Sequence, residues 1–165
     1  MYKLGDRVMY GTHGVCEIVR LEQKRIERKN IEYYVLSPVH SSSACFYIPT
    51  QNEKALSKLT SLLSKDELVR VLTDQAAAED PWIDDENARR QLIKEVLASG
   101  NQAELIRWVR TMHIHRSLLL DAGKKFHQAD EMFLKDAEKI LMTEFAIVLE
   151  IPEDSVRQCV QQLVM

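Results

Sequence analysis

The chain has 165 residues, enough for one ordinary domain or two small ones, and 45% of them are apolar, which is sufficient to build a buried core. No apolar run approaches the roughly 20 residues that cross a bilayer, and the first residues lack the long apolar stretch of a signal peptide. We therefore expect a cytoplasmic protein without membrane contact.

The three cysteines are odd in number, widely spaced and outside any C-x-x-C pair. This pattern argues against a disulfide framework and a structural zinc site. We expect each cysteine to be a small buried apolar residue.

The charge is distributed unevenly along the chain. Residues 1–58 contain nine Lys or Arg and six Asp or Glu, a net charge of +3, whereas residues 59–165 contain thirteen and nineteen, a net charge of −6. A charge of −6 is not typical of a general nucleic-acid binder, because phosphate contacts need local positive charge. Residues 89–125 nevertheless contain eight basic and three acidic residues. Positive charge is therefore concentrated in the middle of an acidic half.

The first 50 residues have the pattern of β-strands. Residues 7–10 end at a turn with two glycines, and residues 15–26 alternate imperfectly between apolar and polar side chains. Two further runs of β-branched and aromatic residues, at 32–36 and 44–48, are separated by polar turns. Short runs with closely spaced turns predict a small twisted barrel or meander.

After Pro49 the apolar residues recur at helical spacing, beginning with Leu59. Residues 74–85 are rich in Ala, then acidic, and we predict that they form a connector. The remaining periodic segments predict helices at 86–98, from 101 towards 120, at about 129–149, and after Pro152, carrying Val156, Val160, Leu163 and Val164.

Two local signals mark the corner between the first two of these long helices. Gly100 suits the position just past a helix end, and Asn101 with Glu104 resembles a capping box. The fold class that we predict is α+β with two domains: a small β-barrel at 1–58, followed by an all-helical domain at 59–165.

The sequence contains no pattern typical of catalysis. A phosphate-binding glycine loop and a G-x-S-x-G nucleophile motif are both absent. His113 and His115 are roughly 200° apart on a helix, so they cannot bind one metal ion together. We therefore predict that the protein is not an enzyme and has no metal and no cofactor. The alternative is an active site assembled across the fold from distant residues.

Three features are candidates for binding or packing. Residues 22–29 are strongly charged, which fits either a solvated hairpin end or a binding surface. Trp82 precedes a predicted helix, and it has two interpretations: an apolar staple over the start of that helix, or a ring that faces a ligand. Trp108 falls on the apolar side of its predicted helix, and we expect it in the core.

Four N-terminal segments form one pattern: Lys-Leu-Gly-Asp-Arg-Val-Met-Tyr at 3–10, His-Gly-Val at 13–15, Glu-Tyr-Tyr-Val-Leu at 32–36 and Tyr-Ile-Pro at 47–49. This pattern resembles the CarD/CdnL family and the polymerase-interacting module of transcription-repair coupling factor. The second half is similar in a Trp followed by paired Arg, in the Ala-Ser-Gly corner at 98–100, and in the run from Leu134 to Glu144.

The resemblance implies a Tudor-like (SH3-like) barrel that binds the β subunit of RNA polymerase. The polymerase contacts that it implies are Lys24, Arg25, Ile26, Tyr47 and Pro49. Tyr47 differs from the family pattern, because many relatives have an arginine there, although an aromatic side chain is also common at interfaces.

The resemblance also implies that the helical domain lies at the upstream edge of the transcription bubble, where a tryptophan wedges into the minor groove and basic residues hold the backbone. The DNA contacts that it implies are Trp82, Arg89, Arg90, Lys94, Lys124 and Lys125. The chain departs from the family pattern in its longer spacing from Trp82 to the Arg pair, in Phe126-His127 at a usual Leu-Ser, and in the acidic Glu131.

Two functions follow as hypotheses. In the first, a monomer binds polymerase and, weakly and without sequence specificity, promoter DNA, so that it favours the open complex by binding that state more tightly. In the second, the protein is an adaptor whose barrel binds polymerase while its acidic helices bind another protein and not DNA. The salt dependence of DNA binding distinguishes the two.

Overall fold

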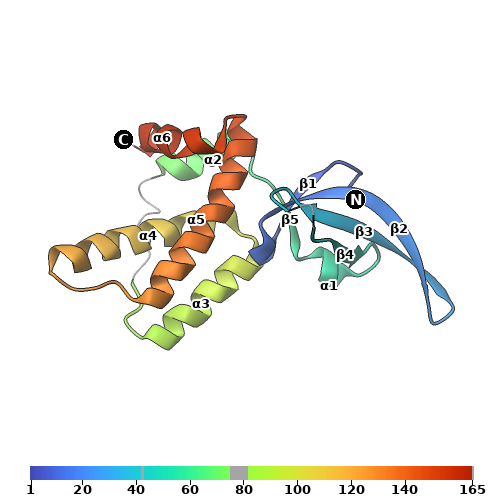
Figure 1. Ribbon diagram of the computed structural model, residues 1–165, viewed down its shortest axis with the longest axis horizontal. Coiled ribbons are helices and arrows are strands. Elements are labelled where there is room, and N and C mark those ends of the chain that lie inside the picture. The colour runs from blue at the N-terminus through green and yellow to red at the C-terminus, as the bar shows by residue number, and fades with distance from the viewer. Residues whose placement is uncertain (42, 75–81, 165) are drawn as a thin grey trace. The chain divides into compact units, whose positions relative to one another are not determined.

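Figure 1 shows the computed structural model, which describes residues 1–41, 43–74 and 82–164. The chain divides into two compact units, Met1–Leu62 and Leu63–Met165. The first contains a five-stranded antiparallel sheet and the second is helical, which confirms the predicted α+β fold class. Most of the predicted connector, 75–81, lies outside the described residues, as do the side chains of Leu163 and Val164.

The strands of the first unit pair in the order β4-β3-β2-β1-β5. Their bounds are Arg7–Tyr10 (β1), Val15–Ile26 (β2), Lys29–Pro38 (β3), Phe46–Pro49 (β4) and Leu59–Ser61 (β5). A 3-10 turn, η1 (Gly11–His13), joins β1 to β2, and a short helix, α1 (Glu53–Leu56), precedes β5.

The prediction that helical structure begins at Leu59 is wrong. Leu59 pairs with Tyr10 in β5 and is buried in the core of the sheet. A strand of three residues is too short to show a periodicity of its own. Leu59 therefore falls into the helical spacing of the leucines that follow it, although it belongs to a strand.

The core of the first unit is made by inward-facing residues of all five strands. They are Val8, Cys16, Ile18, Tyr34, Leu36, Ile48 and Leu59. Burial raises the pKa of the Cys16 thiol to about 11, so this cysteine behaves as the small apolar residue that we expected. The same expectation is wrong for Cys45, which is exposed just before β4, and Cys159 is half-buried.

β2 and β3 form a long hairpin whose tip extends beyond the other strands (Figure 1). At the tip, Glu27 and Arg28 both have positive φ, 48° and 67°, between the paired residues Ile26 and Lys29. Two central residues with positive φ define a type I′ turn, which suits the twist of a hairpin but strains side chains that carry a Cβ atom.

Replacing Glu27 with Asn and Arg28 with Gly is therefore expected to stabilise the first unit, by about 1 kcal/mol, because Asn-Gly adopts this turn with little strain. All five tyrosines lie in the first unit, so urea unfolding followed by tyrosine near-UV circular dichroism measures the effect. The control is Glu27→Val, which is expected to destabilise the unit. A stabilised valine variant would contradict the role of backbone strain.

Within its described residues, the second unit contains five helices. Their bounds are Lys65–Thr73 (α2), Glu86–Ser99 (α3), Gln102–Asp121 (α4), Gln128–Leu149 (α5) and Glu153–Val164 (α6). The predicted corner is confirmed in part: Gly100 is left-handed, with φ of 68°, and the Asn101 side chain accepts a hydrogen bond from the Glu104 amide. The Asn101 amide donates to Ser99 Oγ and not to the Glu104 side chain, so the full capping box is not formed. Asp85 caps α3 in the same way, through the amide of Ala88.

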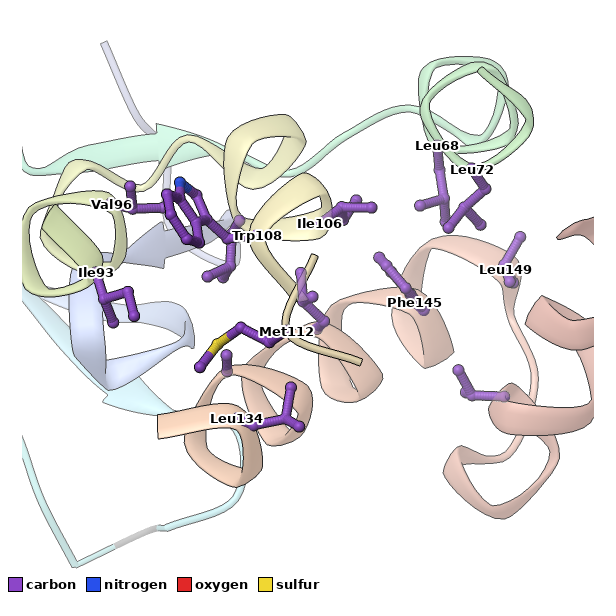
Figure 2. Close-up of a cluster of buried hydrophobic side chains, with 14 residues drawn as sticks. Leu68, Leu72, Ile93, Val96, Ile106, Trp108, Met112, Leu134, Phe145 and Leu149 are labelled. Atoms are coloured by element: carbon purple, nitrogen blue, oxygen red, sulfur yellow. The ribbon is translucent and has the colours of Figure 1, made fainter. Parts of the chain in front are cut away.

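The helices bury one continuous apolar core, part of which Figure 2 shows. Trp108 and Met112 of α4 lie between α3 and α5, with the Trp108 ring beside Val96 (Figure 2). Only 4% of Trp108 is exposed, which confirms the prediction that it belongs to the core. Leu68 of α2 and Phe145 of α5 extend the same core along the unit.

Candidate functional site

One side of the sheet carries charged and aromatic side chains that contact one another. Lys24 Nζ lies 3.6 Å from the ring centroid of Tyr47, and Arg20 donates a hydrogen bond from Nη2 to the Tyr47 hydroxyl at 3.3 Å. Glu22 is paired with both cations, and Tyr33 meets Tyr47 edge to face, with centroids 6.2 Å apart. We call the side of the sheet that carries these five residues the β2–β4 face.

Arg20 carries a firmly held positive charge on this face. The hydrogen bonds that Arg20 makes with Glu22 and Tyr47 raise its pKa further above the physiological range. A lysine beside an aromatic ring is favourable because the ring face carries negative potential. The face thus combines fixed positive charge with a flat aromatic surface, both typical of protein interfaces.

The register of β2 decides which predicted polymerase contacts belong to this face. β2 pairs with β3 without interruption from Arg20 to Ile26, after a β-bulge between Ile18 and Arg20. Because successive side chains of a strand point to opposite sides, Lys24 and Ile26 share the β2–β4 face. Arg25 points to the other side of the hairpin.

On β4, the remaining two predicted contacts share this face. Tyr47 and Pro49 are two residues apart on the strand, and Pro49 is directly opposite Tyr33. Tyr47 is 38% exposed and Ile26, near the hairpin tip, is 45% exposed. The structure therefore gathers four of the five predicted residues on one side of the sheet and places Arg25 apart from them.

In the helical unit, Trp82 lies just ahead of α3 and is half-buried against the core. Its ring stacks on the His115 ring of α4, with centroids 3.6 Å apart and an interplanar angle of 12°. The Arg89 guanidinium carbon lies 4.5 Å over the Trp82 ring, and Phe126 is 6.4 Å away at a tilt.

Arg89 is the largest fully buried side chain of the described residues, with 2% exposed. It pairs with Asp130 of α5 through two bonds, Nη2 to Oδ2 at 2.6 Å and Nε to Oδ1 at 3.1 Å. Nη1 also donates to the backbone carbonyls of Ile83 and Asp84. The guanidinium is thus enclosed and occupied, so Arg89 is not available to a phosphate, and we leave it out of the proposed DNA surface.

The other basic residues of the predicted DNA surface are exposed. Arg90 forms an ion pair with Glu86 one turn earlier, at 2.5 Å, and Lys94 lies on the same side of α3 one turn later. Lys124 and Lys125 lie in the loop between α4 and α5, directly before Phe126. Because the Phe126 ring lies beside the Trp82 ring, the end of that loop is close to Trp82.

Two members of this site had no signal in the sequence, His115 and Asp130. In the sequence, His115 stands out only as a possible metal ligand beside His113. Its stacking partner, Trp82, lies 33 positions earlier along the chain, so no local pattern links the two. Asp130 stands in the first turn of a helix, where an acidic residue is expected without any special role. The carboxylate instead faces inward, and only the packing of α3 against α5 brings Arg89 to it.

Within residues 1–41, 43–74 and 82–164, no three His, Cys, Asp or Glu side chains cluster as metal ligands would. Over the same described ranges, every helix is too short or too polar to cross a membrane.

Residues 2–60 match the family model of the CarD-like/TRCF RID domain. The match begins before β1 and reaches into β5, so it spans nearly the whole first unit. No curated protein matches the chain. The first unit is a CarD-like/TRCF RID domain.

The RID domain is the RNA polymerase-interacting domain of CarD-like and TRCF proteins, and in CarD/CdnL proteins it is not catalytic. Its presence links this chain to RNA polymerase binding and so to transcription. The family match stops at residue 60, so it carries no information on the helical unit that holds Trp82.

Proposed function

We propose that the protein regulates transcription by binding the β subunit of RNA polymerase through its RID domain and promoter DNA through its helical unit. The helical unit contacts the upstream edge of the bubble, and this contact stabilises the open complex. The observation that carries the proposal is the match of residues 2–60 to the RID domain.

The β2–β4 face is the proposed polymerase contact. Lys24, Ile26, Tyr47 and Pro49 lie on it, and the Lys24–Tyr47 contact gives it the aromatic and cationic character of interface hot spots. Arg25 is excluded because strand alternation turns it away from this face.

A charge reversal at Lys24 is expected to weaken polymerase binding at least about tenfold, since it removes the contact with Tyr47 and places a second carboxylate beside Glu22. The measurement is the Kd of Lys24→Glu for an isolated fragment of the polymerase β subunit. Arg25→Glu is the matched control: it makes the same charge change one residue away, on the other side. Equal losses in both variants would show that net charge, and not this face, decides binding.

The proposed DNA contact combines Trp82 with the exposed lysines near it. Trp82 is only half-buried, and Lys124 and Lys125 directly precede the neighbouring Phe126. Arg90 and Lys94 add positive charge along α3. Because residues 59–165 carry a net charge of −6, we expect binding to be weak until polymerase holds the helical unit near DNA.

Trp82→Ala is expected to shorten the lifetime of the open complex at least about fivefold, because an inserted aromatic side chain stabilises an unstacked base step. The lifetime is measured with a labelled promoter fragment after addition of a competitor. The variant's affinity for the polymerase β subunit is expected to be unchanged, since Trp82 lies outside the RID domain.

Replacing Lys124 and Lys125 together with Gln tests the phosphate contacts separately. The slope of log affinity against log salt concentration, measured on forked promoter DNA with polymerase, is expected to fall by about 1 to 2. If neither variant changes open-complex lifetime or salt dependence while polymerase binding is normal, the helical unit does not act on DNA, and the adaptor function replaces the proposed one.

A further inference from the structure

The ring of Trp82 is held more firmly than a surface contact residue needs to be. Two different helices touch it: His115 of α4 by stacking at 3.6 Å, and Arg89 of α3 with its guanidinium 4.5 Å over the ring. A half-buried tryptophan with two such partners keeps one orientation.

Arg89 also fixes the backbone next to Trp82. Its Nη1 donates to the carbonyl of Ile83 at 2.7 Å and to that of Asp84 at 3.3 Å, the two residues that directly follow Trp82. The guanidinium itself cannot move, because Asp130 holds its other two nitrogens in a buried pair. The Trp82 side chain and the backbone of the two residues that follow it therefore contact the same guanidinium.

His115 is suited to the stacking role. Burial and the nearby charge of Arg89 lower its pKa, an effect that Asp84 and Asp130 partly oppose. The lowered pKa favours the neutral imidazole, which lies flat against the indole. Because the buried Arg89 already carries a positive charge, a second cation at this position would be repelled.

We infer that His115, together with Arg89, is a positioning residue that holds the Trp82 ring in the orientation in which it enters an unstacked step of promoter DNA. The inference rests on the proposed function. A contact residue that is already fixed loses little conformational freedom on binding, so more of the contact free energy appears as affinity. In this arrangement Trp82 has both of the functions considered for it: its ring packs against His115 and Arg89, and the same residue, only half-buried, contacts DNA.

Acrylamide quenching of tryptophan fluorescence in the full-length protein tests, without DNA, whether His115 holds the Trp82 ring. Trp108 is 4% exposed, so the quenchable signal reports Trp82. His115→Ala is expected to lower the ratio of held to free Trp82 rings about two- to tenfold, the effect of one aromatic pair, and so to raise the quenching constant. His115→Leu, which fills the space without stacking, is expected to behave like His115→Ala. His115→Phe is expected to restore the wild-type value.

The second measurement is open-complex lifetime on polymerase for the same variants. His115→Ala and His115→Leu are expected to shorten it towards the value of Trp82→Ala, and His115→Phe to restore it. A merely structural role would change thermal stability but would not give this order. The positioning role is overturned if quenching is unchanged in His115→Ala, or if quenching rises while lifetime stays at the wild-type value.

The failure of the proposed function looks different. In that case Trp82→Ala itself leaves open-complex lifetime unchanged, which removes the DNA contact and with it the reason for positioning. The quenching constants still decide whether His115 holds the ring.

Discussion

Asp130→Ala is expected to lower the free energy of unfolding of the helical unit by about 3–5 kcal/mol, the largest effect of any single substitution proposed for this chain. The carboxylate pairs with Arg89 while both side chains are enclosed, with 6% and 2% of them exposed. Removing it leaves a buried guanidinium without its counter-charge. Both tryptophans lie in the helical unit, so urea unfolding followed by tryptophan fluorescence measures the loss.

Two further variants separate this effect from a general loss of charge. Glu86→Ala breaks the ion pair with Arg90, whose partners are 44% and 47% exposed, and is expected to cost about 0.5 kcal/mol or less. Replacing both partners of the buried pair, Arg89→Met with Asp130→Leu, is expected to recover more than half of the loss, because no unpaired charge remains. A double variant as unstable as Asp130→Ala would indicate that packing, and not charge, is responsible.

Glu144→Gln is expected to flatten the pH dependence of stability of the helical unit. Glu144 of α5 is fully buried; its Oε1 accepts a hydrogen bond from the Leu63 amide at 3.1 Å, and its Oε2 has no hydrogen-bond partner among the described residues. Burial, opposed by the hydrogen bonds from Leu63 and Gln102, raises the pKa of this carboxyl from 4.5 to about 7.

The raised pKa of Glu144 determines how the stability of the helical unit changes with pH. In the unfolded chain Glu144 loses its proton near pH 4.5, whereas in the folded chain it keeps the proton up to about pH 7. Its contribution to stability is therefore fully present below pH 4.5 and is lost as the pH rises to about 7, by about 3 kcal/mol in total. Glutamine cannot ionise, so the variant is expected to retain this stability at pH 8.

The test is urea unfolding of the wild type and Glu144→Gln at pH 5 and pH 8, because only the difference between the two proteins isolates this carboxyl. Asp136→Asn, an exposed change on the same helix, is the control and is expected to leave the pH dependence as it is in the wild type. If Glu144→Gln shows the full wild-type dependence, the buried carboxyl ionises as it does in water.

The sequence predicted the fold class and most helix ends because those depend on local signals. Gly100 and Asn101 act within one turn of chain, and their role needs no knowledge of the rest of the fold. Leu59 was misassigned for the opposite reason: its place in β5 depends on pairing with β1, about 50 residues earlier. Strand pairing of this kind leaves no periodic trace in a three-residue segment.

The functional surfaces were predictable only in part. Lys24 and Tyr47 are proposed as contacts because of the family resemblance, whereas Trp82 is also a candidate from its aromatic ring and its position ahead of a predicted helix. The exposure of an arginine depends instead on the rest of the fold. Arg89 and Arg90 are the same residue type side by side, and they differ only in the side of α3 that they occupy. The partner that neutralises Arg89 comes from another helix, 41 positions away.

Cys45 gives the RID domain a chemical handle. Its thiol is exposed two residues before Tyr47, whereas burial raises the pKa of Cys16 to about 11 and keeps that thiol unreactive. Once the half-buried Cys159 is replaced with Ser, a maleimide-linked photo-crosslinker would therefore attach beside the β2–β4 face at a native cysteine. On illumination it would form a covalent bond to the polypeptide that covers that face, and the cross-linked product would identify the binding partner.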